Sequence, residues 1–191
     1  ANVDARAEHL VQFAKMGSIY MEKVFGIDKP KVGIVNIGAE EEKGNALVKE
    51  TFPLLKKSRD INFTGSIEAR EIPSGDCDVI VCEAFTGNVI LKLYEGVGKT
   101  LLSEIKNALT ENFLTKIGAL LIKSALKRKL KKFDSSEQGQ GGAPMLGLKG
   151  LVIKAHGNSK ANEISKAILQ CISFDEQNIT SLIEASMAKT E

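Results

Sequence analysis

The sequence predicts a layered α/β fold with a largely parallel sheet. Apolar residues at helical spacing alternate with short β-branched runs along the 191 residues, and three of those runs lead into loops rich in glycine and polar residues. One run, DVIVCEA at 78–84, is continuously apolar in its centre, as a parallel strand covered on both faces is. Strands that alternate with helices favour parallel pairing with right-handed crossovers.

The composition is that of a folded protein. The chain is 43% apolar and 26% charged, which suits one packed core or a large piece of a two-part enzyme. It begins with Ala1 and enters a helical pattern almost at once, so we expect an N-terminal portion to be missing. No stretch resembles a cleaved signal or approaches the roughly 20 apolar residues of a membrane span. A cytoplasmic location is therefore expected.

Metal and cofactor sites are not predicted. The chain has an odd number of cysteines, namely Cys77, Cys82 and Cys171. No two of them have the spacing of a metal knuckle or a redox motif. We expect reduced, structural thiols. Only His9 and His156 could supply imidazole ligands, which argues against a zinc site built on histidines.

The charge of the chain is unevenly distributed. Residues 112–133 contain seven Lys and Arg residues and no acid, so this segment carries +7, while 19 basic and 24 acidic residues elsewhere give −5. A basic element on an acidic body indicates a specific anionic partner surface rather than general affinity for nucleic acid.

The first half of the chain predicts two helices and three strands. A helix is expected from about Arg6 to Phe25, where Gly26 supplies a stop. KVGIVNIG at 31–38 reads as a buried strand, and 45–58 reads as a helix that Pro53 should bend or restart. INFTGSI at 61–67 and DVIVCEA at 78–84 are the next strands.

A further helix is predicted from Thr86 onward. It contains Gly98-Lys99-Thr100, the tripeptide that ends a phosphate-binding P-loop. A P-loop needs a strand and a glycine five residues before Gly98, but Leu93 stands there within a helical pattern. A nucleotide-binding loop is therefore excluded at this position.

The basic segment 112–133 has two apolar sides, turned from one another by more than roughly 100° at about 100° per residue. One straight amphipathic helix cannot bury both, so we expect a kink or two short helices near 122–124, forming a basic amphipathic hairpin. A glycine-rich loop, a fourth strand LVIKAHG at 151–157 and two closing helices complete the chain.

Ligands of open parallel sheets bind beyond the carboxyl ends of the strands. Three loops there carry polar or glycine residues: Asn36 and Gly38; Glu83, Thr86, Gly87 and Asn88; and His156 and Gly157. Thr86 is a good helix cap, and the free amides of a helix start attract anions. Lys92 could add positive charge. The alternatives are simple capping with a surface lysine, and a structural histidine at 156.

Five segments in this order, VGIVNIGAEEEKGN, INFTGSIEARE, DVIVCEAFTGNVILKLYEG, GGAPMLGLKG and VIKAHGNS, closely resemble the phosphate acyltransferase (PlsX) family of bacterial phospholipid synthesis. The resemblance covers nearly the whole chain. It implies that residues 1–191 are the C-terminal portion of a single domain whose N-terminal portion is absent here. It also implies a three-layer α/β/α sandwich similar to isocitrate and isopropylmalate dehydrogenases and phosphotransacetylases.

The resemblance implies an activity: reversible transfer of a fatty acyl group from acyl carrier protein to inorganic phosphate, giving acyl phosphate. Phosphate mainly needs positioning, and the thioester oxygen needs donors as charge develops on it. We assign Thr86, Gly87 and Asn88 to phosphate or oxyanion contact, with Glu83 and Gly157 in the adjoining substrate site. Asn36 and Gly38 would shape the wall, Lys92 would neutralise charge, and His156 would donate to the oxyanion or the departing sulfur.

The resemblance also implies homodimers that act at the cytoplasmic membrane, hence a cytoplasmic, peripherally membrane-associated protein. The basic segment would contact the membrane or the acidic carrier protein through Leu120, Leu121, Lys123, Lys127 and Arg128. A dimer-interface hairpin is the structural alternative.

Two further functions remain open at this stage. One is an acyl-CoA phosphotransacetylase on the same fold, and the other is a non-catalytic module that binds membrane or carrier protein. The segment EQGQGGAP lacks the aromatic residue that the family usually has before Gly-Gly-Ala-Pro, so the contact made by that loop is in question.

Overall fold

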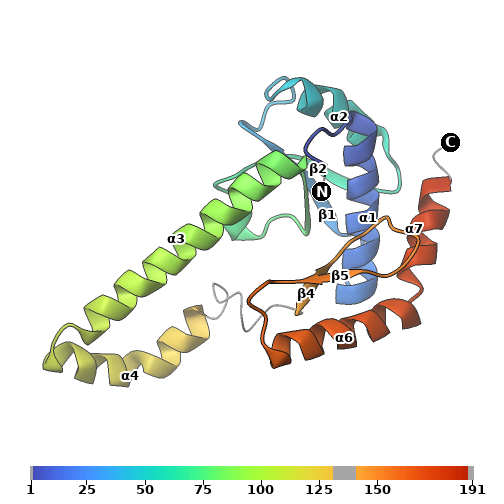
Figure 1. The fold of residues 1–191 in the computed structure, drawn as a ribbon. Helices are drawn as coiled ribbons and strands as arrows, with labels where there is room; N and C mark the ends of the chain where they lie inside the picture. The colour runs from blue at the N-terminus through green and yellow to red at the C-terminus, as the bar shows by residue number, and fades with distance from the viewer. Residues whose placement is uncertain (1, 131–140, 189–191) are drawn as a thin grey trace.

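The structure, a computed structural model, describes residues 2–130 and 141–188. Its elements in chain order are α1 (Ala7–Phe25), β1 (Lys31–Asn36), α2 (Ala46–Lys57), β2 (Asn62–Glu68), the 3-10 turn η1 (Ile72–Ser74), β3 (Val79–Val81), α3 (Ala84–Thr110), α4 (Phe113–Leu130), β4 (Gly142–Pro144), β5 (Ile153–Ala155), α6 (Ala161–Glu176) and α7 (Ile179–Ala188). Figure 1 shows a body built around α1 and the sheet, from which α3 projects.

Three parallel strands form the central sheet, in the order β2-β1-β3. β1 pairs with β2 from Lys31↔Asn62 to Asn36↔Glu68, and its other side pairs with β3. Helices flank this sheet, so the predicted α/β class with a parallel sheet is confirmed and agrees with an α/β/α layering. The carboxyl ends of all three strands lie at one edge.

The core lies between this sheet and the two helices α1 and α2. Val32 and Ile34 of β1 are fully buried and point to the same face, because alternate residues of a strand share a face. They pack against Leu10 of α1 and Leu55 of α2 within one apolar cluster. α2 runs through Pro53 as a single helix, so of the predicted bend or restart the restart does not occur.

The glycine-rich region and the last strand form a separate unit. β4 and β5 pair antiparallel in their own two-stranded sheet, so β5 does not extend the parallel sheet as the sequence suggested. Leu146 and Leu151 of this unit pack against Met16 in the second half of α1, with Phe174 of α6 and Ile183 of α7. α6 and α7 confirm the two predicted closing helices.

The helical hairpin is larger than predicted. Residues 113–130 form one helix, without the expected break near 122–124, and the chain reverses at 111–112. The arms of the hairpin are therefore α3 and α4 (Figure 1). The prediction assumed that both apolar sides of the segment had to be buried, whereas Leu121 on α4 is 80% exposed. A reciprocal cap starts α4: Asn112 Oδ1 accepts from the Thr115 amide, and Thr115 Oγ1 accepts from the Asn112 amide.

α3 has an extended apolar surface that no element of the described residues covers. None of its residues is buried, and Leu93, Val97 and Leu101 are each more than half exposed. The tripeptide Gly98-Lys99-Thr100 lies inside this helix, as expected. Within 2–130 and 141–188, no helix is both long enough and apolar enough to cross a membrane.

Candidate functional site

The candidate site lies where the parallel strands end. The loop after β1 starts at Asn36, and Cys82 and Glu83 connect β3 directly to α3. Because β1 and β3 are neighbouring parallel strands, this loop and the start of α3 emerge beside each other at the same edge of the sheet. Two of the three predicted loops are therefore brought together.

The side chain of Asn36 holds the loop after β1. It is only 6% exposed, and its Nδ2 donates to the Lys43 carbonyl (3.2 Å) and to Ser66 Oγ of β2 (2.9 Å). Its Oδ1 accepts from the Ile37 amide (2.8 Å). Asn36 therefore uses its hydrogen-bonding groups to fix the loop and to join it to β2. Ser66, which has no distinguishing sequence motif, was not identified from the sequence.

Two glycines allow this loop to close tightly. Gly44 has φ of 100°, and a Cβ there would lie 2.7 Å from Asn36 Oδ1, so backbone conformation and space both require glycine. Gly38 is buried, and a Cβ there would lie 2.8 Å from Glu40 Oε2 and 3.2 Å from Lys43 Cγ. Gly38 thus lies against the side chains of its own loop.

Glu83 caps helix α3, so the predicted cap at Thr86 is wrong by three residues. Its carboxylate accepts from the amides of Phe85 (2.5 Å) and Thr86 (3.0 Å), and also from the Thr86 hydroxyl. The Ala84 amide donates to the Asn2 carbonyl, and the Gly87 amide donates to the Glu83 carbonyl. The first four amides of α3 therefore all have partners, and an anion at this helix start must compete with Glu83.

Two polar side chains follow on the first turns of α3. Asn88 is exposed, and its Nδ2 donates to the Ala84 carbonyl (2.8 Å), which leaves Oδ1 directed away from that bond. Lys92 is exposed one turn further along. Asn88 and Lys92 lie on one face of α3, because residues four apart on a helix are neighbours.

Cys82 adjoins this cap but is not an activated nucleophile. Burial raises the pKa of the Cys82 thiol to about 11, and the negative charge of Glu83 adds to that shift. Its Sγ would lie 3.1 Å from a Cβ at Gly87, so the glycine makes room for it. At neutral pH the thiol is protonated and unreactive.

His156 and Gly157 follow β5 and belong to the separate antiparallel unit. Both residues are exposed, and His156 Nδ1 accepts from the Asn158 amide (3.2 Å). This bond leaves Nε2 as the proton-bearing nitrogen of a neutral ring. β5 packs with β4 and α6, and Figure 1 shows this unit apart from the start of α3. The structure therefore does not bring the third predicted loop together with the other two.

The hairpin residues divide between two sides. Leu120 and Lys123 line a groove between α3 and α4, whereas Leu121 points elsewhere and is 80% exposed. Arg128 is exposed, and the side chain of Lys127 lies outside the described part of the structure, as does the segment 131–133. Among the described residues, no group of three or more His, Cys, Asp or Glu could hold a metal ion.

Known proteins resemble this chain over almost its whole length. It is 52% identical to a phosphate acyltransferase of Clostridium botulinum over 190 residues, and 49% identical to one of Clostridium perfringens strain SM101 over 189. A phosphate acyltransferase of Brevibacillus brevis is 47% identical over 189 residues. These matches cover 99% of this chain but only 55–56% of each relative, so the chain spans about half the length of these proteins.

A family model described as a fatty acid synthesis protein matches residues 1–182, nearly the entire chain. The matched range includes the parallel sheet, the start of α3 and the α3–α4 hairpin. The chain therefore belongs to the fatty acid synthesis protein family.

Proposed function

We propose that this chain is part of a phosphate acyltransferase that transfers a fatty acyl group from acyl carrier protein to inorganic phosphate. The observation that carries the proposal is the match of 99% of the chain to relatives named phosphate acyltransferase, at 47–52% identity. The product, acyl phosphate, would serve phospholipid synthesis.

The reaction needs no protein nucleophile. An oxygen of hydrogen phosphate attacks the thioester carbonyl carbon, the carbon–sulfur bond breaks, and the carrier leaves as a thiolate that takes up the proton given off by the phosphate. The raised pKa of Cys82 fits this direct transfer, because a protonated thiol cannot form an acyl-enzyme. The task left to the chain is to hold phosphate and to stabilise the oxyanion.

The start of α3 is the proposed phosphate site. Thr86, Gly87 and Asn88 would contact phosphate once Glu83 releases the amides of the first turn, and Lys92 would lower the cost of bringing the anion close. The loop fixed by Asn36 would form the adjoining wall, and Gly38 would shape that wall from within the loop, where it is buried. The donor role predicted for His156 and the substrate contact predicted for Gly157 stay predictions, because both residues belong to the other unit.

The product of the full reading frame that encodes this chain tests the activity. We expect acyl phosphate from inorganic phosphate and an acyl carrier protein thioester, trapped as a hydroxamate, and slower formation from the matching CoA thioester. Asn88→Ala should lower the rate about tenfold or more, while Asn107→Ala on the same helix should not. If neither thioester gave acyl phosphate, the result would contradict the proposal. An unchanged rate of acyl phosphate formation in the His156→Gln variant would remove His156 from the mechanism.

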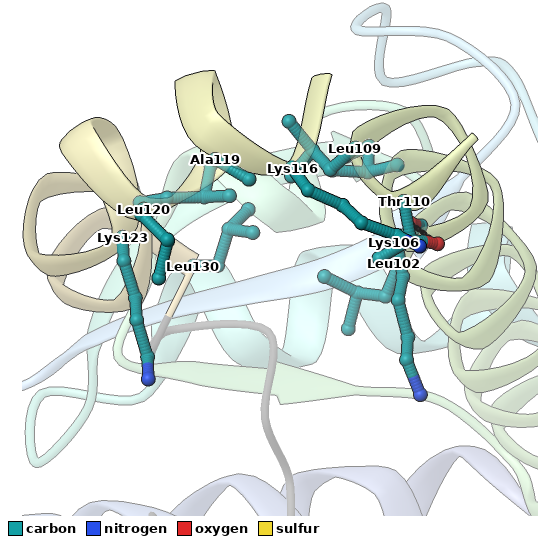
Figure 2. Close-up of a pocket in the computed structure, with 11 residues that line it drawn as sticks. Leu102, Lys106, Leu109, Thr110, Lys116, Ala119, Leu120, Lys123 and Leu130 are labelled. Carbon is teal, nitrogen blue, oxygen red and sulfur yellow. Dashed lines mark hydrogen bonds between the residues drawn. The ribbon is translucent and has the colours of Figure 1, made fainter. Parts of the chain in front are cut away.

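We also propose that α4 attaches the protein to anionic lipid. Phe113, Leu114 and Leu121 are 76–80% exposed, and Arg128 is exposed on the same side of α4 as Leu121 at about 100° per residue, whereas Lys123 lines the groove between α3 and α4 (Figure 2). Each basic residue near an anionic leaflet contributes about 1 kcal/mol, and inserted apolar side chains add to it. Leu121→Glu should reduce sedimentation with vesicles that contain phosphatidylglycerol, whereas Ser124→Glu, with the same charge change, should reduce it less. Equal reductions in sedimentation for the two variants would mean that the protein binds the vesicles through charge alone and not through inserted apolar side chains.

A homodimer is the third part of the proposal. The row Leu93, Val97 and Leu101 is 56–65% exposed on a helix that has few contacts with the body of the chain. A second copy could cover this row. Sedimentation equilibrium should give twice the chain mass and a monomer for Val97→Glu, with Ser103→Glu unchanged. A monomeric parent protein would contradict this assignment.

A further inference from the structure

The strand β2 contains a β-bulge on its way to the candidate site. Val32 of β1 pairs with Phe63, but the next residue, Gly33, pairs with Gly65. Thr64 is therefore an extra residue of β2, and its hydroxyl donates to the Val32 carbonyl (3.0 Å). Gly65 has φ of 108°, a backbone conformation that favours glycine. A bulge of this kind changes the direction in which the side chains after it point.

The bulge decides on which face of the sheet Ser66 lies. Phe63 packs against the apolar cluster that contains Val32 and Ile34, so it lies on their face. In a regular strand alternate residues share a face, and Ser66, three residues after Phe63, would lie on the opposite one. The extra residue reverses this alternation, so that Ser66 pairs with Ile34 and its Oγ accepts from Asn36 Nδ2 (2.9 Å). Without the bulge, Ser66 would point away from Asn36.

The side chain of Asn36 joins the two ends of the loop after β1. Its amide nitrogen donates to the Lys43 carbonyl and to Ser66 Oγ, and its Oδ1 accepts from the Ile37 amide. Two of these contacts lie within the loop, whereas Ser66 is the contact with the neighbouring strand. Because Asn36 is only 6% exposed, water does not readily replace an acceptor that is lost there. Ser66 thus fixes the orientation of the side chain that fixes the loop.

We propose that Ser66 is a positioning residue for the phosphate site, and that the bulge at Gly65 directs it toward Asn36. The inference rests on the proposed function, in which phosphate binds at the start of α3 and the loop 37–44 forms the adjoining wall. Ser66 acts through Asn36 and not on phosphate itself. A loop that is already fixed loses less conformational freedom when phosphate binds, so binding costs less free energy.

Steady-state kinetics of the full reading-frame product, with phosphate varied at saturating acyl carrier protein thioester, test the inference. Ser66→Ala should raise the KM for phosphate about fivefold, the effect of one lost hydrogen bond, while kcat and the KM for the thioester stay within about twofold. Ser66→Thr keeps the hydroxyl and should keep the parent KM. Ser58→Ala is the control, because it removes a hydroxyl that donates to the Leu54 carbonyl at the end of α2, and it should leave the KM for phosphate unchanged.

The bulge can be tested with two glycine variants. Gly65→Ala and Gly75→Ala each place a Cβ on a residue of positive φ, 108° and 79°, where no described residue beyond the chain neighbours comes within 4 Å. Both should lower the free energy of unfolding through the backbone conformation alone. Only Gly65→Ala should also raise the KM for phosphate, by about fivefold, because it disturbs the direction of Ser66.

Two further measurements show whether Ser66 acts through Asn36 and the loop. The double variant Asn36→Ala/Ser66→Ala should have the same KM for phosphate as Asn36→Ala alone, because the contact between them is already lost. In this chain without substrate, Ser66→Ala should raise the rate of hydrogen exchange at the amides of 37–44 about fivefold, whereas Ser58→Ala should not.

Four outcomes overturn the inference: an unchanged KM for phosphate in Ser66→Ala, an equal rise in Ser66→Ala and Ser58→Ala, a double variant with a higher KM than Asn36→Ala, or unchanged exchange at 37–44 in Ser66→Ala. Failure of the proposed function would look different. The reading-frame product would then form no acyl phosphate, while hydrogen exchange at 37–44 would still rise in Ser66→Ala.

Discussion

The carboxylate of Glu83 accepts hydrogen bonds from both the backbone amide and the hydroxyl of Thr86. A helix start that binds a free anion offers unpaired amides, but here the chain supplies the anion itself. The amides are thus preorganised around a negative group that phosphate would have to replace. Glu83 is the residue through which the phosphate proposal can be tested most directly.

Glu83→Gln should increase the affinity for phosphate. The variant keeps an oxygen that can cap α3 but removes the charge that repels the ligand. The loss of one repulsion at contact distance in a solvated site is worth about 1 kcal/mol, or about fivefold in affinity. Phosphate titration followed by 31P NMR measures the change.

The control for that change is Glu95→Gln, which removes the same charge three turns along α3. It should leave phosphate affinity within about twofold, since charges so distant at the surface are largely screened. Unchanged affinity in Glu83→Gln would place the phosphate site elsewhere.

Asn36 should matter for stability through the loop it holds. Asn36→Asp replaces an amide donor with a carboxylate that faces the Lys43 carbonyl in a buried position, at an expected cost of about 1–3 kcal/mol in the free energy of unfolding. Urea denaturation measures it. Asn62→Asp breaks a similar amide-to-carbonyl bond at an exposed position and should cost less than about 1 kcal/mol. Equal costs would mean that burial of Asn36 is not decisive.

The parallel sheet and its helices could be predicted from the sequence because their signals are local. Val32 and Ile34 lie in a β-branched run with a glycine ahead, and Leu10 recurs at helical spacing. These patterns predict the helices and strands whatever the arrangement of the rest of the chain. Pairing is less local: nothing in LVIKAHG shows that its partner is Gly142–Pro144 rather than the central sheet.

The details of the candidate site depended on side chains that no motif marks. The cap was assigned to Thr86, a common cap residue, because a glutamate three positions earlier is not the usual choice. Ser66 contacts Asn36 across 30 residues of chain, so only the folded sheet shows the pair. The hairpin was misjudged because its apolar sides are not all buried within this chain.

Cys82 should react slowly with thiol reagents. Burial, with the help of Glu83, raises the pKa of this thiol to about 11, so little thiolate forms below pH 9. Alkylation by iodoacetamide, followed by peptide mass spectrometry, should therefore be slow at pH 8 and accelerate above about pH 10. Glu83→Gln removes the second cause and should move the acceleration to lower pH. Rapid alkylation at pH 7 would contradict the protonated state assigned to Cys82.

The same shift makes stability depend on pH. The folded thiol holds its proton to a higher pH than the unfolded one, whose pKa is about 9.0. The contribution of this proton to the free energy of unfolding is complete below pH 9. It is lost as the pH rises from about 9 to about 11, because the unfolded state then releases the proton before the folded state does. Cys82→Ala should flatten this part of the stability curve, as measured by urea denaturation at several pH values. If the dependence of the free energy of unfolding on pH were unchanged in Cys82→Ala, groups other than Cys82 would be its cause.

The turn between α3 and α4 should depend on Asn112. Its side chain and that of Thr115 cap each other's amides at the start of α4, an arrangement worth about 1 kcal/mol. α4 has few contacts besides those with α3, so Asn112→Ala should raise hydrogen exchange in 113–120 while leaving exchange in α1 and β1 unchanged. Asn107→Ala is the control, because Asn107 lies before this cap on α3 and its side chain takes no part in it. Equal increases in both variants would mean that the hairpin, rather than this cap, sets the stability of α4.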